Sequence, residues 1–113
     1  MKAVATDANG VISIAEVPIP TYGDYECLVR IRACGICNST DLKLIENAVD
    51  GIPVQYPALL GHEAVGEIVE RGAKVRNFNV GDRVVTPRGR LERGTPYHSA
   101  WAAMTEYGIA HDL

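Results

Sequence analysis

Apolar and polar residues alternate along residues 27–33, the segment CLVRIRA. The positions divide between two faces as follows: Cys27, Val29, Ile31 and Ala33 on one, Arg30 and Arg32 on the other. A period of two is typical of a half-buried β-strand, because successive side chains point to opposite faces of the sheet. The segment therefore predicts a strand whose apolar face, including Cys27, lies in the core.

Further short apolar runs predict strands at residues 2–6, 10–17, 64–70, 82–86 and 105–110. Each run is bounded by Gly, Pro, Asn or Asp residues, which favour turns. We also assign Trp101 and Tyr107 to a strand and expect both rings to pack in the interior. Short strands at regular spacing are typical of a barrel or a sandwich, so the expected fold class is mainly β.

One helix is predicted directly after Cys37. Ser39 or Thr40 can cap its N-terminus, and Asp41 falls in its first turn, where a carboxylate is favourable. Its expected apolar side consists of Leu42, Leu44 and Ile45. The helix should run for two or three turns and end before a Gly-Ile-Pro turn, because glycine and proline stop helices.

The longest predicted loop covers residues 86–100, the segment TPRGRLERGTPYHSA. It is rich in Gly and Pro and carries Arg88, Arg90 and Arg93, so we interpret it as a solvated surface loop. His98 and His111 have no partner at metal-ligand spacing, and we expect both at the surface.

Length and composition argue against a nucleic-acid-binding protein and against a membrane protein. The 113 residues fit one domain spanning residues 1–113, and a net charge of −3 without a basic stripe argues against a nucleic-acid partner. No apolar run approaches the roughly 18–20 residues of a membrane span, and no signal-peptide h-region follows the first methionine. Three clustered cysteines favour a reducing compartment. We therefore expect a cytoplasmic protein without a membrane partner.

Cys37 and His62 are the first candidate metal ligands, each at the boundary of a predicted element. Thiolate sulfur and imidazole nitrogen are preferred ligands of zinc. The spacing alone leaves open a buried structural cysteine and a structural histidine. Cys34 and Cys37 also have the spacing of half a zinc knuckle or of a redox pair, but the second ligand pair and the βαβ context of such motifs are missing.

A longer motif carries a family resemblance. It consists of Gly61, His62, Glu63, Gly66, Gly72 and Val75. This spacing resembles the signature of the zinc-dependent medium-chain alcohol and polyol dehydrogenases, and VRIRACGICNSTDLKL is similar to their catalytic-cysteine segment. The resemblance covers nearly the whole chain and implies a GroES-like β-barrel catalytic domain with short helices. It also implies one catalytic zinc bound by Cys37 and His62, with Glu63 as a close or alternate ligand.

The resemblance further implies a mechanism. Zinc binds an alcohol oxygen and lowers its pKa, and hydride then passes to NAD or NADP. Asp41 is similar to the carboxylate that hydrogen-bonds the zinc-bound histidine. A hydroxyl next to the metal relays the proton, and both Ser39 and Thr40 are candidates because this chain has one residue more than the family pattern between Cys37 and Asp41.

Several family features are missing from these residues. No cysteine follows Cys37, so no structural zinc is expected, and the third zinc ligand of the resembling enzymes lies beyond this chain. No G-x-G-x-x-G motif marks a Rossmann domain. We therefore expect a fragment of a dehydrogenase for an alcohol, polyol or amino alcohol, inactive alone and homo-oligomeric when full length. The alternatives are a stand-alone barrel acting as a binding or assembly module and a zinc-free reductase of the same superfamily.

Overall fold

Short strands dominate the computed structural model, which describes residues 1–51, 53–85, 87–99 and 101–112. The elements of these residues are β1 (Lys2–Thr6), β2 (Ile12–Glu16), β3 (Glu26–Gly35), α1 (Thr40–Ile45), β4 (Ala58–Leu59), β5 (Glu63–Arg71), β6 (Arg83–Val85), β7 (His98–Ser99) and β8 (Tyr107–His111). The predicted mainly β class is confirmed.

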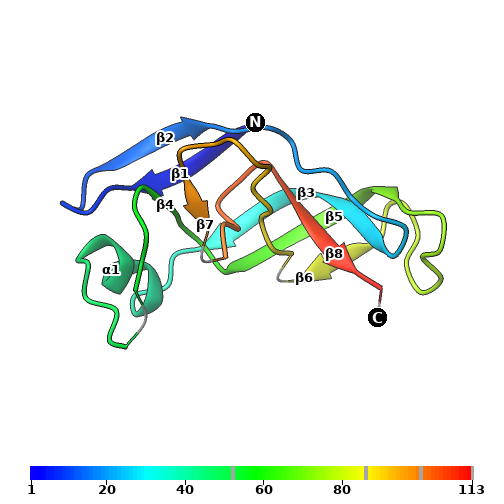
Figure 1. The fold of residues 1–113 in the computed structure, drawn as a ribbon. Helices are drawn as coiled ribbons and strands as arrows, with labels where there is room; N and C mark the ends of the chain where they lie inside the picture. The colour runs from blue at the N-terminus through cyan, green and yellow to red at the C-terminus, as the bar shows by residue number, and fades with distance from the viewer. Residues whose placement is uncertain (52, 86, 100, 113) are drawn as a thin grey trace.

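The strands form two four-stranded sheets, with the orders β2-β1-β4-β7 and β6-β5-β3-β8 (Figure 1). All neighbours are antiparallel except β4 and β7, which run parallel over two residues. The strands β3 and β5 are the two inner strands of the second sheet, and β3 pairs with β5 along one edge and with β8 along the other.

The segment 102–106 connects the two sheets. The Val4 N–H donates to the Met104 carbonyl at 2.9 Å, and the Ile31 N–H donates to the Glu106 carbonyl at 2.9 Å. Val4 belongs to β1 and Ile31 to β3, so one short segment is hydrogen-bonded to both sheets. This connection closes one side of the barrel that the sequence predicts.

Each sheet contributes an apolar cluster to the interior. One cluster is formed mainly by small residues of the first sheet and its surroundings: Ala3, Ala5, Ala15, Val17, Leu59 and Ala102. The other lies on the second sheet: Cys27, Val29, Ile68 and Val75. The prediction that Cys27 is a core residue is confirmed, since its exposed fraction is 0%.

The alternation predicted for β3 holds only in part. Cys27 and Val29 are buried and Arg30 is exposed, as expected, but Ala33 is exposed instead of buried. The pairing with β5 shifts register between Ile31 and Ala33, and this irregularity changes which residues face the core.

The helix differs from the prediction in length and in its buried side. It spans six residues and ends before Asn47, whose φ of 54° is incompatible with a continuing helix. Leu44 is buried and Ile45 half-buried, as expected, but Leu42 is 42% exposed and Asp41 is buried, so the expected apolar side was wrong for Leu42. No helix of the described ranges is long and apolar enough to cross a membrane.

The predictions for three aromatic residues have different outcomes. Tyr107 begins β8 as predicted, but Trp101 lies outside the strands and is 36% exposed, so its assignment to a packed strand was wrong. His98 was expected in a surface loop, yet it is half-buried in β7. The remaining described part of that loop is largely irregular, as predicted.

Candidate metal centre

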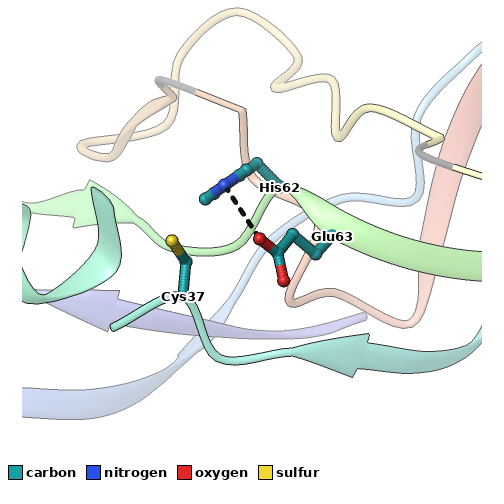
Figure 2. Close-up of side chains that lie close together, drawn as sticks. All are labelled: Cys37, His62 and Glu63. Carbon is teal, nitrogen blue, oxygen red and sulfur yellow. Dashed lines mark ion pairs between the residues drawn. The ribbon is translucent and has the colours of Figure 1, made fainter. Parts of the chain in front are cut away.

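Three potential ligand side chains from two segments meet at one place. Cys37 lies in the turn between β3 and α1, His62 directly precedes β5, and Glu63 is the first residue of β5. One ligand atom of each, the sulfur, an imidazole nitrogen and a carboxylate oxygen, lies within 4.8 Å of the others. Figure 2 shows the three side chains converging, with Glu63 directed toward His62.

Asp41 connects the two segments that carry these side chains. Its side chain is 1% exposed; Oδ2 accepts a hydrogen bond from the Cys37 N–H at 2.8 Å, and Oδ1 accepts one from the Gly61 N–H at 3.1 Å. One buried carboxylate therefore fixes the backbone at Cys37 and immediately before His62. Because an unpaired buried N–H is costly, these bonds restrain the geometry of the cluster.

The imidazole of His62 faces a carboxylate on each side. Its Nε2 lies 3.6 Å from Glu63 Oε1, and its Nδ1 lies 3.8 Å from Asp41 Oδ1. A separation of 3.8 Å is too long for a hydrogen bond, and the buried Nδ1 has no hydrogen-bond partner among the described residues. A ring with one nitrogen toward a candidate ligand and the other toward a carboxylate fits a metal-binding histidine.

The direction of the pKa shift distinguishes Cys37 from Cys34. The backbone N–H groups of Thr40 and Ser39, together with the Thr40 hydroxyl, lower the pKa of the Cys37 thiol. The Thr40 nitrogen lies 3.4 Å from the sulfur. Burial instead raises the pKa of Cys34, whose sulfur lies close to Gly61 beside the centre. Because the thiolate is the metal-binding form, the surroundings favour Cys37 as a ligand.

The two candidate relay residues occupy different environments. Thr40 is half-buried, its N–H donates to the Cys37 sulfur at 3.4 Å, and its hydroxyl is one of the groups that lower the pKa of that thiol. Ser39 is exposed and makes no side-chain capping hydrogen bond, although it occupies the N-cap position of α1. The structure therefore separates two residues that the sequence leaves equivalent.

Gly61 determines the backbone turn directly before His62 and Glu63. Its φ is +94°, a conformation that residues with a Cβ adopt only with strain. A Cβ at this position would lie 2.5 Å from Met104 Cγ and 2.6 Å from the Met104 nitrogen. Glycine is thus required here so that the chain can turn against the segment 102–106 and present His62.

A cavity of about 240 Å³ adjoins the centre and is lined by His62, Pro87, Arg88, Trp101 and Ala103. The rings of Trp101 and His62 lie 5.5 Å apart, centroid to centroid, and are inclined at 48°. Trp101 is thus a wall of the candidate site that the sequence interpretation missed. No local pattern identifies it, because its position depends on how the segment after β7 folds back.

The donor set agrees with zinc chemistry. One thiolate sulfur, one imidazole nitrogen and one carboxylate oxygen are all common zinc ligands, and catalytic zinc is typically held by three protein ligands. The three side chains approach closely enough for a common ion. Cys37, His62 and Glu63 therefore form a candidate zinc site.

Comparison with known proteins gives one family match. The family described as "Alcohol dehydrogenase GroES-like domain" matches residues 23–110, a range that contains every residue of the candidate metal centre. Among curated relatives, the chain is 42% identical over 80 residues to "Probable cinnamyl alcohol dehydrogenase 9" of Oryza sativa subsp. japonica. The matched segment covers 71% of this chain and 21% of the relative.

A bacterial relative and a solved structure give the same picture. The chain is 39% identical over 90 residues to "Sorbitol dehydrogenase" of Bacillus subtilis, covering 79% of this chain and 25% of the relative. Its fold matches "Alcohol dehydrogenase TADH from Thermus sp. ATN1" with a TM-score of 0.75 and 26% identity, over 98% of this chain and 37% of that one. The chain thus spans between a fifth and two-fifths of the proteins that it matches.

Proposed function

The chain belongs to the family of the alcohol dehydrogenase GroES-like domain, and from this premise we propose that it forms the zinc-binding part of the catalytic domain of an NAD(P)-dependent dehydrogenase. The proposed substrate is an alcohol, polyol or amino alcohol. The observation that carries the proposal is the convergence of Cys37, His62 and Glu63 within 4.8 Å, inside the matched region.

In the proposed site, Cys37, His62 and Glu63 hold one zinc ion. Bound zinc supplies Lewis acidity that favours the deprotonated form of an alcohol oxygen. Asp41 positions the ligands through its hydrogen bonds to the backbone of Cys37 and Gly61. Its carboxylate also faces His62 Nδ1 at 3.8 Å, on the side where an orienting partner of a metal-bound imidazole belongs.

We assign the proton relay to Thr40 in preference to Ser39. The Thr40 N–H donates to the Cys37 sulfur at 3.4 Å and its hydroxyl helps to lower the pKa of that thiol, so Thr40 lies beside a proposed ligand atom. Ser39 points to solvent and makes no capping bond. A relay hydroxyl must lie within hydrogen-bond reach of the proton it moves, and Thr40 meets this requirement better.

The remaining catalytic parts are proposed to lie outside these residues. The matched relatives are much longer than this chain, which leaves room for a dinucleotide-binding Rossmann domain and for a zinc ligand with which Glu63 would alternate. On this proposal the 113 residues alone do not transfer hydride, and the complete enzyme is a homo-oligomer.

Zinc content per chain, measured by elemental analysis after dialysis, tests the proposed site. Cys37→Ala and His62→Ala should each weaken zinc binding by more than about 100-fold, since even indirect contacts to a metal contribute 10- to 100-fold. Glu63→Gln should weaken it less, because an amide oxygen remains. Cys34→Ser and Glu67→Gln, on the neighbouring strands, serve as matched controls and should retain zinc.

The outcome also separates the alternatives. If neither this protein nor a longer form that contains it binds zinc, the dehydrogenase mechanism fails, and a zinc-free reductase or a barrel-type binding module becomes the better interpretation. Retention of zinc by His62→Ala would place the metal elsewhere in the molecule.

A further inference from the structure

A second cavity is lined mostly by residues 88–99, together with Ile109 and His111 of β8. We call residues 87–99 the arginine loop. The volume of the cavity is about 490 Å³, within the range of small-molecule sites. The basic residues that line it are Arg88, Arg90, Arg93, His98 and His111. None of the three metal-ligand candidates lines this cavity.

Two of the carboxylates near the cavity are already engaged. Glu26 binds Arg90 through two hydrogen bonds, at 2.7 and 2.5 Å, and thereby neutralises that guanidinium. Glu92 lines the cavity, but one of its oxygens accepts hydrogen bonds from the Thr21 N–H at 2.7 Å and from the Thr21 hydroxyl at 2.9 Å. Neither carboxylate pairs with the other arginines.

Arg88 and Arg93 remain as unneutralised cations at this cavity. Within residues 1–51, 53–85, 87–99 and 101–112, neither side chain makes a hydrogen bond or an ion pair. Glu92 keeps its negative charge, because its hydrogen bonds come from the neutral Thr21. Arg88 and Arg93 together still exceed it by one positive charge, which produces a locally positive potential in a protein whose net charge is −3.

The frame around these cations is fixed by backbone contacts. Arg88 and Ile109 exchange N–H···O hydrogen bonds of 3.1 and 2.7 Å, which attach the start of the arginine loop to β8. The end of the loop is β7, which pairs with β4. The Arg90–Glu26 pair ties the middle of the loop to β3. A cavity held at three points needs little ordering when a ligand binds.

We propose that this cavity binds the phosphate group of a small ligand through Arg88 and Arg93. The planar guanidinium fork matches phosphate oxygens and forms short, charge-assisted hydrogen bonds. Arg88 also lines the 240 Å³ cavity beside His62, so the two hollows share a wall. The phosphate belongs either to a phosphorylated alcohol that reaches both cavities or to a separate molecule that occupies only the arginine loop.

Titration with inorganic phosphate, followed by calorimetry and by the thermal midpoint, tests the site. Saturable binding is expected, and Arg88→Gln and Arg93→Gln should each weaken it by about 10- to 100-fold, the usual contribution of hydrogen bonds to charged groups. Arg30→Gln, which removes an exposed arginine from β3, is the matched control and should bind phosphate normally. Circular dichroism confirms that each variant is folded.

Trp101 distinguishes the two sources of phosphate, because it is the only tryptophan and lines the cavity beside His62. A phosphorylated alcohol is indicated if glycerol 3-phosphate changes Trp101 fluorescence while phosphate and glycerol do not, and if Arg88→Gln abolishes the change. A separate ligand is indicated if phosphate and glycerol 3-phosphate bind equally and leave the fluorescence unchanged.

The proposal is overturned if phosphate does not bind saturably, or if Arg30→Gln weakens binding as much as Arg88→Gln, since the effect would then be general charge. Repeating the titration with the His62→Ala variant separates this proposal from the metal site, because phosphate binding should persist when zinc binding is lost.

Discussion

At the scale of single residues, the surroundings of the three cysteines shift their thiol pKa values in different directions. The sulfur of Cys37 accepts hydrogen bonds from the start of α1, which lower its pKa. Burial raises the pKa of both Cys27 and Cys34. Only Cys37 therefore combines a stabilised thiolate with a position in the metal group.

Alkylation by iodoacetamide should follow this order. Cys37 should react fastest near neutral pH, because the thiolate is the nucleophile and its lowered pKa increases the thiolate fraction. Thr40→Ala removes the hydroxyl that helps to lower the pKa of this thiol and should shift the rate profile of Cys37 to higher pH, while Ser39→Ala should leave it unchanged. Peptide mass spectrometry over about pH 6 to pH 9 measures the rates. Faster labelling of Cys34 would contradict the assignment.

The sequence predicts the metal-ligand candidates better than the walls of their site. Cys37 and His62 are visible because of residue type and position, and Glu63 because it belongs to the same short motif. Trp101 and Arg88 are not visible, since each reaches the cavity beside His62 only through the path of an irregular segment. Ligand candidates can be found from short sequence motifs, whereas the residues that line a cavity are brought together from distant parts of the chain.

At the scale of elements, the β3–β5 pair carries the site, because Cys37 follows one strand and His62 precedes the other. Alternation predicts both strands but not their register shifts, since nothing in CLVRIRA marks a bulge. The helix illustrates the same limit. Its apolar residues fit a longer helix, but Asn47 in a left-handed conformation ends it early.

Gly66 is the point where this strand pair tolerates no side chain. A Cβ there would lie 2.4 Å from Val29 Cγ1 and 2.6 Å from the Arg30 carbonyl oxygen. Gly66→Ala should destabilise the protein by about 3 kcal/mol, because part of the clash is with backbone and cannot be relieved by a rotamer change. Urea denaturation measures the loss. Gly23→Ala, where the nearest atom is a side-chain oxygen at 3.5 Å, should change stability by less than about 0.5 kcal/mol. Equal effects would show that the backbone entropy lost on replacing glycine, not steric contact, decides the change in stability.

At the scale of the whole molecule, the fold class was predictable and the closure of the barrel was not. The short strands and the family resemblance indicate a β-barrel, but β4 and β7 have two residues each and leave no periodic signal. The segment 102–106, which is hydrogen-bonded to both sheets, is largely irregular. Long-range closure thus depends on backbone contacts that no local pattern encodes.

The arginine loop is attached to the second sheet by the Glu26–Arg90 pair, and this attachment should make stability depend on pH. The two hydrogen bonds from Arg90 are the main cause that lowers the pKa of Glu26 from 4.5 to about 2. A carboxyl whose pKa is lower in the folded protein contributes stability above its unfolded pKa and loses it as the pH falls through its folded pKa. The contribution of this pair is therefore present above pH 4.5 and is lost toward pH 2.

Glu26→Gln tests this attachment. The substitution should lower the free energy of unfolding at neutral pH by about 1–2 kcal/mol, a value reduced for solvent screening because the Arg90 side chain is partly exposed. The variant should also lose less stability than the natural protein as the pH falls. Some loss in acid should remain, because the pKa values of Glu92 and Asp112 are lowered too. Denaturation by urea at a series of pH values measures both effects, with the exposed Glu46→Gln as the control. If Glu26→Gln and the natural protein lose stability in parallel as the pH falls, the arginine loop is held by its backbone contacts to β8 and β4, and the ion pair contributes little.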